Sequence, residues 1–249
     1  MDTRPLPETC CPDEPILWIG QGRATYLGPS LHLDPHSGSV HCFALGLDGP
    51  FELHAADIGE QQVRSAFIPA RTHHQLIART GRMLFDYSDT TEPRNHMTVH
   101  TKTIAYNHRD EEALIQAIKT TPKPPQHQPT APTKPDARIQ TAMRTLQTNP
   151  NLSAPTLAAQ LHLSPSRFQH LFTANTGTTF RRYRLWTRMT QVAKALTTGA
   201  NLTRAATEAG FASPNHFSET FHTMFGLTPT TLLTTGTKIV IQSTNNNPT

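Results

Sequence analysis

The chain has 249 residues and a formal net charge of +4, which is enough for two domains of ordinary size. Three cysteines, with no signal peptide and no long apolar run, argue against a secreted disulfide scaffold or a membrane protein and fit a soluble protein of the reducing cytoplasm. Residues 136–249 carry ten Lys or Arg against three acids, whereas residues 1–120 carry ten against fifteen. A basic half beside an acidic half predicts one DNA-binding domain and one domain with another task.

Residues 1–120 read as short strands separated by turns. Strands at this spacing predict a barrel or a sandwich. Alternation along 40–47 places His41, Phe43, Leu45 and Leu47 on one face, expected to point inward. We therefore take His41, Phe43 and His74 as candidates for a ligand pocket. The candidate strands are 16–19, 23–27, 40–47, 51–54, 63–68, 74–78 and 82–87.

A helix over 110–120 follows, with an apolar stripe of Leu114, Ala117 and Ile118 that suits either a dimer contact or a cover for the strands. Residues 121–136 hold six prolines and no large apolar side chain, so they predict an extended, semi-stiff linker. At the other end of the chain, residues 236–249 read as a tail in which 238–241 could pair as a short strand.

Two stretches, 164–177 and 213–226, repeat one another at an offset of 49 positions. Each opens with Ser-Pro, a hydroxyl N-cap followed by a proline suited to the first helical position, and each ends at a glycine. Shorter helices over 154–160 and 202–209 precede them, so each pair predicts a helix-turn-helix unit. Between the units, 179–198 has the apolar pattern of a helix of ~30 Å, close to one turn of B-DNA.

Over about residues 137–235 the chain resembles the AraC/XylS family of bacterial transcription regulators. The resemblance implies a C-terminal all-α double helix-turn-helix domain that binds double-stranded DNA at a promoter site of about two major grooves. It also implies contact with RNA polymerase and, by family habit, activation of transcription. The most specific match is Gly210-Phe211-Ala212-Ser213-Pro214-Asn215-His216-Phe217-Ser218, followed by Phe221, Phe225-Gly226 and Thr228-Pro229.

The N-terminal half carries a second resemblance. Ile68-Pro69-Ala70 followed by His73-His74 resembles the turn of the cupin-like β-barrels that such regulators use as sensor domains. The expected fold is therefore α+β. The resemblance implies a small-molecule effector or a homodimer contact for this half. The expected domains are a cupin-like sensor or dimerisation domain at 1–120, the linker at 121–136, the DNA-binding domain at 137–235 and the tail at 236–249.

The base-reading residues are expected on the outward face near the start of each second helix. Gln169 suits a bidentate pair with adenine, and Arg167 suits guanine or a phosphate. Glu219 stands where the family commonly has Arg, so either it selects cytosine or the second unit mostly senses DNA shape; both readings stay open. Arg181 and Arg182 are the expected phosphate clamps, and Arg184 and Arg188 are expected to be structural. The base-reading set is Ser166, Arg167, Gln169, His170, Asn215, His216, Ser218 and Glu219.

Other functions have less support in the sequence. Nine of the fourteen histidines lie in the first 108 residues, but a His-x-His pattern followed by Glu is absent, so we expect scattered histidines rather than a metal site. No spacing supports catalysis or a cofactor, and the adjacent Cys10 and Cys11 are poorly placed to bridge each other. The alternatives are a cupin-type metal-dependent enzyme domain with an autoregulatory DNA-binding domain, and an architectural DNA binder. The available histidines are His32, His36, His41, His73 and His74.

Overall fold

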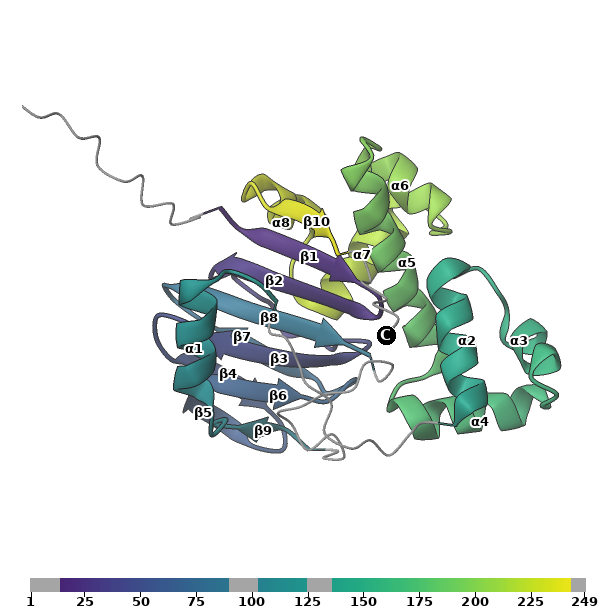
Figure 1. Ribbon diagram of the computed structural model, residues 1–249, viewed down its shortest axis with the longest axis horizontal. Coiled ribbons are helices and arrows are strands. Elements are labelled where there is room, and N and C mark those ends of the chain that lie inside the picture. Colours follow the sequence, from purple (N-terminus) through teal and green to yellow (C-terminus); the bar gives the residue numbers. More distant parts are fainter. Residues whose placement is uncertain (1–13, 90–102, 125–135, 243–249) are drawn as a thin grey trace, which may run out of the picture.

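The computed structural model describes residues 14–89, 103–124 and 136–242. Figure 1 shows a sheet-rich N-terminal half beside a helical C-terminal half, in contact along one side. Cys10, Cys11 and most of the expected linker lie outside the described residues. The α+β class expected from the sequence is confirmed.

The N-terminal half is built from two sheets, and the strands of the described residues do not close into one barrel. The larger sheet has the order β10-β1-β2-β8-β3-β6-β9, and the smaller has the order β5-β4-β7. A buried apolar cluster that includes Ala44, Leu53 and Leu76 draws on strands of both sheets. The strands are β1 (Ile16–Gly20), β2 (Arg23–Pro29), β3 (His41–Gly46), β4 (Phe51–Ala55), β5 (Gly59–Val63), β6 (Ser65–Ile68), β7 (His74–Ile77), β8 (Arg82–Ser88), β9 (Ala105–Tyr106) and β10 (Lys238–Ile241).

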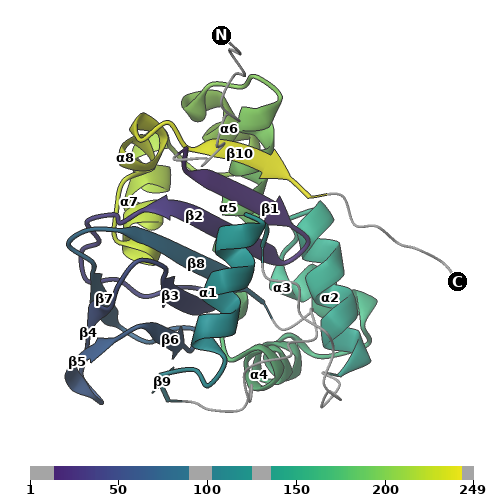
Figure 2. The same cartoon turned by 60° about the vertical axis from the view of Figure 1, so that its left-hand side comes forward.

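Alternation along β3 groups Phe43, Leu45 and Leu47 on one face as expected, but that face does not point inward between the two sheets. All six residues of β3 are buried, because the strand is covered on both faces. Phe43 and Leu45 pack in a separate cluster with Ile115 and Ile118 of helix α1 (Glu111–Thr120). Figures 1 and 2 show α1 lying across the outer face of the larger sheet. The helix thus covers the sheet, the second of the two roles open to it, but Ile115 stands in the place expected for Ala117, which is exposed.

The C-terminal half consists of seven helices whose ends carry the expected caps. Ser164 and Ser213 accept hydrogen bonds from the backbone N–H three residues on, and Gly177 and Gly226 end their helices at positive φ. Such caps satisfy backbone groups that a helix end leaves unpaired. The helices are α2 (Ala137–Thr148), α3 (Ala154–Gln160), α4 (Pro165–Thr176), α5 (Phe180–Thr197), α6 (Leu202–Glu208), α7 (Pro214–Phe225) and α8 (Pro229–Thr234).

The last strand joins the two halves. β10 follows the helical half in the chain, yet it pairs in parallel with β1 at the edge of the larger sheet. Lys238 N donates to Pro15 O over 2.8 Å, and Gln242 N donates to Ile19 O over 2.9 Å. The C-terminal segment therefore covers an edge strand that would otherwise offer unpaired backbone groups.

In the part of the chain that the structure describes, none of the helices combines the length and the apolar character that crossing a bilayer requires.

Candidate functional site: two helix-turn-helix units and an interdomain cavity

The first helix-turn-helix unit is formed by α3 and α4. Phe168 and Phe172 of α4 are fully buried, with ring centroids 5.5 and 5.7 Å from that of Phe180 on α5. This packing fixes one face of α4 against the long helix and leaves the opposite face free. All four predicted base-reading residues of this unit are exposed on the helix: Ser166, Arg167, Gln169 and His170.

The turn of this unit contains a backbone conformation that is unusual for its residue. His162, which stands where the resemblance leads us to expect Gly, has φ of +54°. A side chain in this left-handed region costs about 1–2 kcal/mol relative to glycine. The turn therefore keeps the geometry of the motif with a residue that favours it less.

The second unit, α6 and α7, has the same plan but presents its face less fully. Asn215 and Glu219 are exposed, whereas His216 and Ser218 are half-buried. The His216 ring lies 5.7 Å from Phe211, and its Nδ1 accepts from Ala212 N over 3.4 Å. His216 is thus partly held by its own turn, and Asn215 and Glu219 are the two exposed members of the set predicted for this unit.

Helix α5 separates the two units, and its four arginines have different environments. Arg181 is exposed, as a phosphate contact requires. Arg182 instead donates to the Ser37 carbonyl and to Gly38 O, the second over 3.3 Å, and its burial lowers the pKa of the guanidinium. In this arrangement the N-terminal half holds the Arg182 side chain, so its role as a phosphate clamp stays a prediction.

Arg184 and Arg188 make contacts inside the helical half. Arg184 Nε donates to Pro150 O over 3.2 Å and the guanidinium lies 5.7 Å from the Phe180 ring centroid. Arg188 donates to Asn151 Oδ1 over 2.9 Å. Both contacts tie α5 to the segment between α2 and α3, which is a structural use of the two side chains.

A short segment of the N-terminal half, residues 34–38, binds the C-terminal end of α7; we call it the docking loop. Its backbone N–H groups satisfy carbonyls that the end of a helix leaves without an intrahelical partner. Gly226 permits this approach, because a Cβ there would lie 2.5 Å from Asp34 O. The contacts are Asp34 N to Gly226 O at 2.8 Å, Ser37 N to Thr223 O at 3.1 Å, and His222 Nε2 to Asp34 Oδ2 at 2.9 Å.

A second contact between the halves centres on Asp89, just after β8. The Asp89 carboxylate is buried and accepts from Tyr183 Oη over 2.6 Å and from Gln147 Nε2 over 3.2 Å. Hydrogen bonds to a buried charge are stronger than those between neutral groups. Burial and this carboxylate raise the pKa of Tyr183, so its hydroxyl stays a donor.

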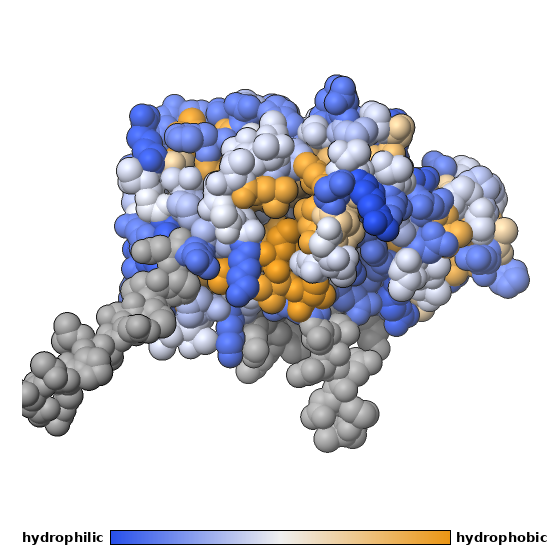
Figure 3. All heavy atoms as spheres, turned by 90° about the horizontal axis from the view of Figure 1, so that it is seen from above, coloured by the Kyte–Doolittle hydropathy of each residue, from blue (hydrophilic) through white to orange (hydrophobic). Residues whose placement is uncertain are grey.

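Between these two contacts lies an apolar cavity. It holds about 620 Å³ of space, its opening to solvent included. Figure 3 shows apolar side chains gathered in a hollow between the two halves. Eight lining residues come from each half: Leu17, Ile19, Ala24, Tyr26, Leu31, Leu33, Phe85 and Tyr87 from the first, and Trp186, Met189, Thr190, Ala193, Phe221, Phe225, Leu227 and Leu232 from the second.

The three residues predicted for a ligand pocket do not line this cavity. Phe43 packs beneath α1, and His41 stacks on Phe67 with a centroid distance of 5.3 Å. His74 is buried beside His36 under the docking loop. The sequence alone did not indicate this cavity. Its lining residues on β1 and β2 show only the alternation of an ordinary strand, and they face residues more than 150 positions away in the chain.

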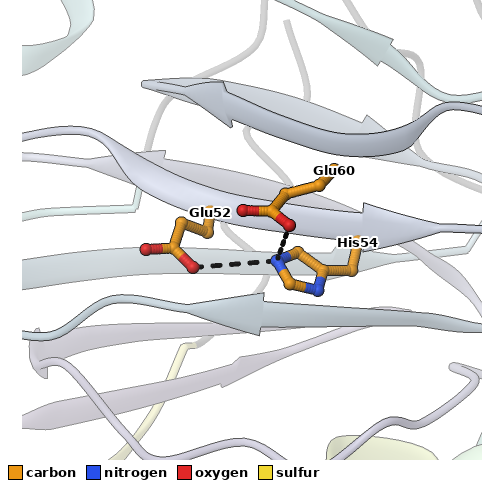
Figure 4. Close-up of side chains that lie close together, drawn as sticks. All are labelled: Glu52, His54 and Glu60. Atoms are coloured by element: carbon orange, nitrogen blue, oxygen red, sulfur yellow. Dashed lines mark ion pairs between the residues drawn. The ribbon is translucent and has the colours of Figure 1, made fainter.

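One group in the described residues has the donor set of a metal site, and it contains none of the five histidines considered from the sequence. His54 Nε2 lies 3.7 Å from Glu52 Oε2 and 3.9 Å from Glu60 Oε2 on neighbouring strands β4 and β5 (Figure 4). Arg79 also pairs with Glu52, at 3.2 Å. The structure thus shows this group as a set of ion pairs on the outer face of the smaller sheet.

Comparison with known proteins agrees with this geometry. Residues 157–235 match the family described as a helix-turn-helix domain. A comparison with curated protein sequences finds no match. Among solved structures, the fold is similar to apo ToxT from Vibrio cholerae, with a TM-score of 0.59 and 12% identity over 86% of this chain and 97% of that one. Unsaturated fatty acid-bound ToxT from Vibrio cholerae has a TM-score of 0.55 and 11% identity over 89% and 98%.

The match falls on two helix-turn-helix units whose outward faces are polar and exposed, so the chain is a DNA-binding transcription regulator. The matched region is a helix-turn-helix domain, and the overall architecture of the chain is similar to that of ToxT.

Proposed function

We propose that the chain binds a specific promoter site through α4 and α7, and that an apolar small molecule in the interdomain cavity controls this binding. The observation that carries the proposal is the lining of the cavity, which the two halves share equally. A molecule in such a site contacts both halves only while they are docked. It therefore favours the docked arrangement by its difference in affinity for the two states.

The effector is uncharged. The sixteen lining residues include neither Lys nor Arg, so nothing in the lining compensates a buried carboxylate. Two of the lining hydroxyls are already used, since Tyr26 donates to Pro29 O over 3.0 Å and Thr190 donates to Thr187 O over 2.8 Å. The solved ToxT complex named above holds an acid, an unsaturated fatty acid. The same architecture here suits a ligand of similar apolar character without the acid group.

Partners beyond DNA and the effector follow from the resemblance alone. A regulator bound beside a promoter works in the cytoplasm and contacts RNA polymerase, with activation as the expected sign. A homodimer is a further expectation. The apolar stripe of α1 does not supply its contact, because Ile115 and Ile118 are buried against the sheet.

Filling the cavity should abolish effector binding. Ala193 lines the cavity from α5, so Ala193→Phe places a ring in the space that the ligand needs. With the wild-type chain, 1-dodecanol should raise the melting temperature and dodecanoate should do so much less, because only the acid loses hydration of a charge. Differential scanning fluorimetry checks both. The matched control is Ala113→Phe at an exposed position of helix α1, and an equal response of the two variants to 1-dodecanol contradicts the site.

Gln169 should set base preference at one position. Its side chain is exposed on the free face of α4, and Gln169→Ala removes a pair of hydrogen bonds to adenine worth roughly 1–3 kcal/mol of discrimination. Binding to a set of sites, each changed at one base pair, measures the preference, with random duplex as competitor. Gln116→Ala on α1 is the control. Unchanged preference at every position removes the assigned role, and equal affinity for promoter and random DNA removes the regulator.

Glu219 should weaken docking of the second unit on phosphates. Glu219 is exposed on α7. Glu219→Arg therefore replaces a negative charge, which DNA phosphates repel, with a positive charge, which they attract. The slope of log affinity against log salt should steepen by about one unit for each added phosphate contact. Glu112→Arg on α1 makes the same charge change away from the expected interface. If both variants change the slope equally, the effect comes from net charge and Glu219 does not face DNA.

A further inference from the structure

Two histidines lie buried side by side beneath the docking loop. His36 belongs to the loop and is 2% exposed, and His74 begins β7 and is 3% exposed. Their ring centroids are 4.4 Å apart. Their backbones exchange two hydrogen bonds, His36 N to His74 O at 2.9 Å and His74 N to His36 O at 3.0 Å. The pair thus attaches the loop to the strand below it.

The contacts of both rings fit the neutral form of the imidazole. His36 Nδ1 donates to Asp34 O and His74 Nδ1 donates to Thr72 O, each over 2.9 Å. In the described residues neither Nε2 has a hydrogen-bond partner, and both are closed off from solvent. Buried polar atoms of this kind are uncommon and costly. A proton added at either Nε2 would create a buried cation with no acceptor beside another imidazole.

The pair lies against the C-terminal end of α7, the second helix of the second helix-turn-helix unit. A Cβ at Gly226 would come within 2.7 Å of His36 Nδ1, so the end of α7 is in van der Waals reach of this ring. The neighbours of His36 in the loop, Asp34 and Ser37, cap the same helix end, and Ser37 also holds Arg182. A displacement of His36 therefore disturbs every contact that the docking loop makes with the helical half.

We propose that the His36–His74 pair is a proton-operated joint: protonation displaces the docking loop and releases the DNA-binding half from the N-terminal half. Release exposes both rings to water and separates them, which removes the cost of the charge. The joint goes beyond the proposed function, because it needs neither the effector nor DNA.

The direction of the pH dependence follows from burial. Burial lowers the pKa of His36, and it lowers the pKa of His74 to about 3, with the neighbouring His36 as the next cause. In the released state both groups return to an ordinary pKa of about 6.5. Docking is therefore undisturbed above pH 6.5. Below it, the ratio of docked to released protein falls by up to about tenfold per pH unit for each histidine, until the docked state also takes up protons.

Three other titratable groups face the pair. His73 and His222 disfavour a charge on His36, whereas Asp34 favours it. His222 Nε2 and Asp34 Oδ2 also lie 2.9 Å apart, so this contact adds to those that hold the docking loop on α7.

The test uses the full chain without DNA or effector. Small-angle X-ray scattering follows the radius of gyration from pH 8 to pH 5, and far-UV circular dichroism shows whether the helices persist. The wild type should expand below pH 6.5 with its helices intact. The double variant His36→Gln, His74→Gln should stay compact, whereas a control with the exposed His32 and His170 changed to Gln should expand like the wild type. No expansion of the wild type, or equal expansion of the double variant, overturns the joint.

A measurement on the wild type covers the case in which the double variant does not fold or is already open at pH 8. NMR titration of the histidine ring protons should place the midpoints of His36 and His74 at least one pH unit below 6.5. An ordinary midpoint for both overturns the joint. Because no promoter or effector takes part, these results are independent of whether the proposed function holds.

Discussion

Asp89→Ala is expected to release the helical half from the N-terminal half even at neutral pH. The substitution removes a buried carboxylate that accepts from Tyr183 and Gln147. Hydrogen bonds to a charged group contribute about 1.5–3 kcal/mol, and the two donors are left in a buried site. We therefore expect a loss of about 2–4 kcal/mol in docking free energy. Hydrogen exchange should quicken in α2 and in the first turns of α5, where these donors lie.

The size of the loss in docking free energy distinguishes the contribution of the Asp89 carboxylate from that of side-chain packing. Tyr183→Phe keeps the ring and removes one donor, so it should cost about 1–2 kcal/mol, less than Asp89→Ala. Asp57→Ala, at an exposed position between β4 and β5, should change nothing. Unchanged exchange in Asp89→Ala, with the fold preserved, would show that the Asp89 carboxylate does not hold the halves together.

Phe172→Ala is expected to cost about 3–5 kcal/mol and to remove the first unit from DNA. The Phe172 ring is fully buried, with centroids 5.7 Å from Phe168, 5.7 Å from Phe180 and 5.4 Å from Tyr183. Without it α4 loses the anchor that orients its exposed face. Urea unfolding measures the stability loss, and protection of the promoter from nuclease cleavage should persist over one major groove only.

Two further variants show whether the loss is local. Phe217→Ala creates the matching cavity in the second unit, where Phe217 lies 5.1 Å from Phe211, and should remove protection from the other groove. Phe172→Leu retains most of the buried volume, so nuclease protection should persist over both major grooves. If Phe172→Ala abolishes protection of both major grooves while its fold is intact, the two units do not bind DNA independently.

The five helices from α3 to α7 could be predicted almost to the residue, because their signals are local, whereas α2 and α8 were not predicted. A Ser-Pro start and a Gly end determine α4 and α7 within the sequence itself, and the structure places Ser164 and Ser213 as caps. The hydroxyl, the fixed φ of proline and the freedom of glycine at positive φ act over a few residues. The exposed face of α4 follows from the burial of Phe168 and Phe172.

The N-terminal half shows where such reasoning stops. Strand β5 was missed because Glu60, Gln61 and Gln62 give it no apolar alternation, although it pairs with β4 throughout. Alternation along β3 does not tell which of its two faces lies between the sheets, because α1 covers the opposite face and both faces are therefore buried. The contacts of Asp89 and of Arg182 with the other half join residues 94 and 145 positions apart. Nothing in a local pattern reveals such pairs.

Because β10 belongs by hydrogen bonding to the sheet and by covalent chain to the helices, the DNA-binding half is anchored at both of its ends. Release at the docking loop or at Asp89 would therefore leave β10 paired with β1, so the helical half stays attached to the sheet by its C-terminal segment. A separately expressed helical fragment lacks this attachment, and removing β10 from the full chain would remove it as well.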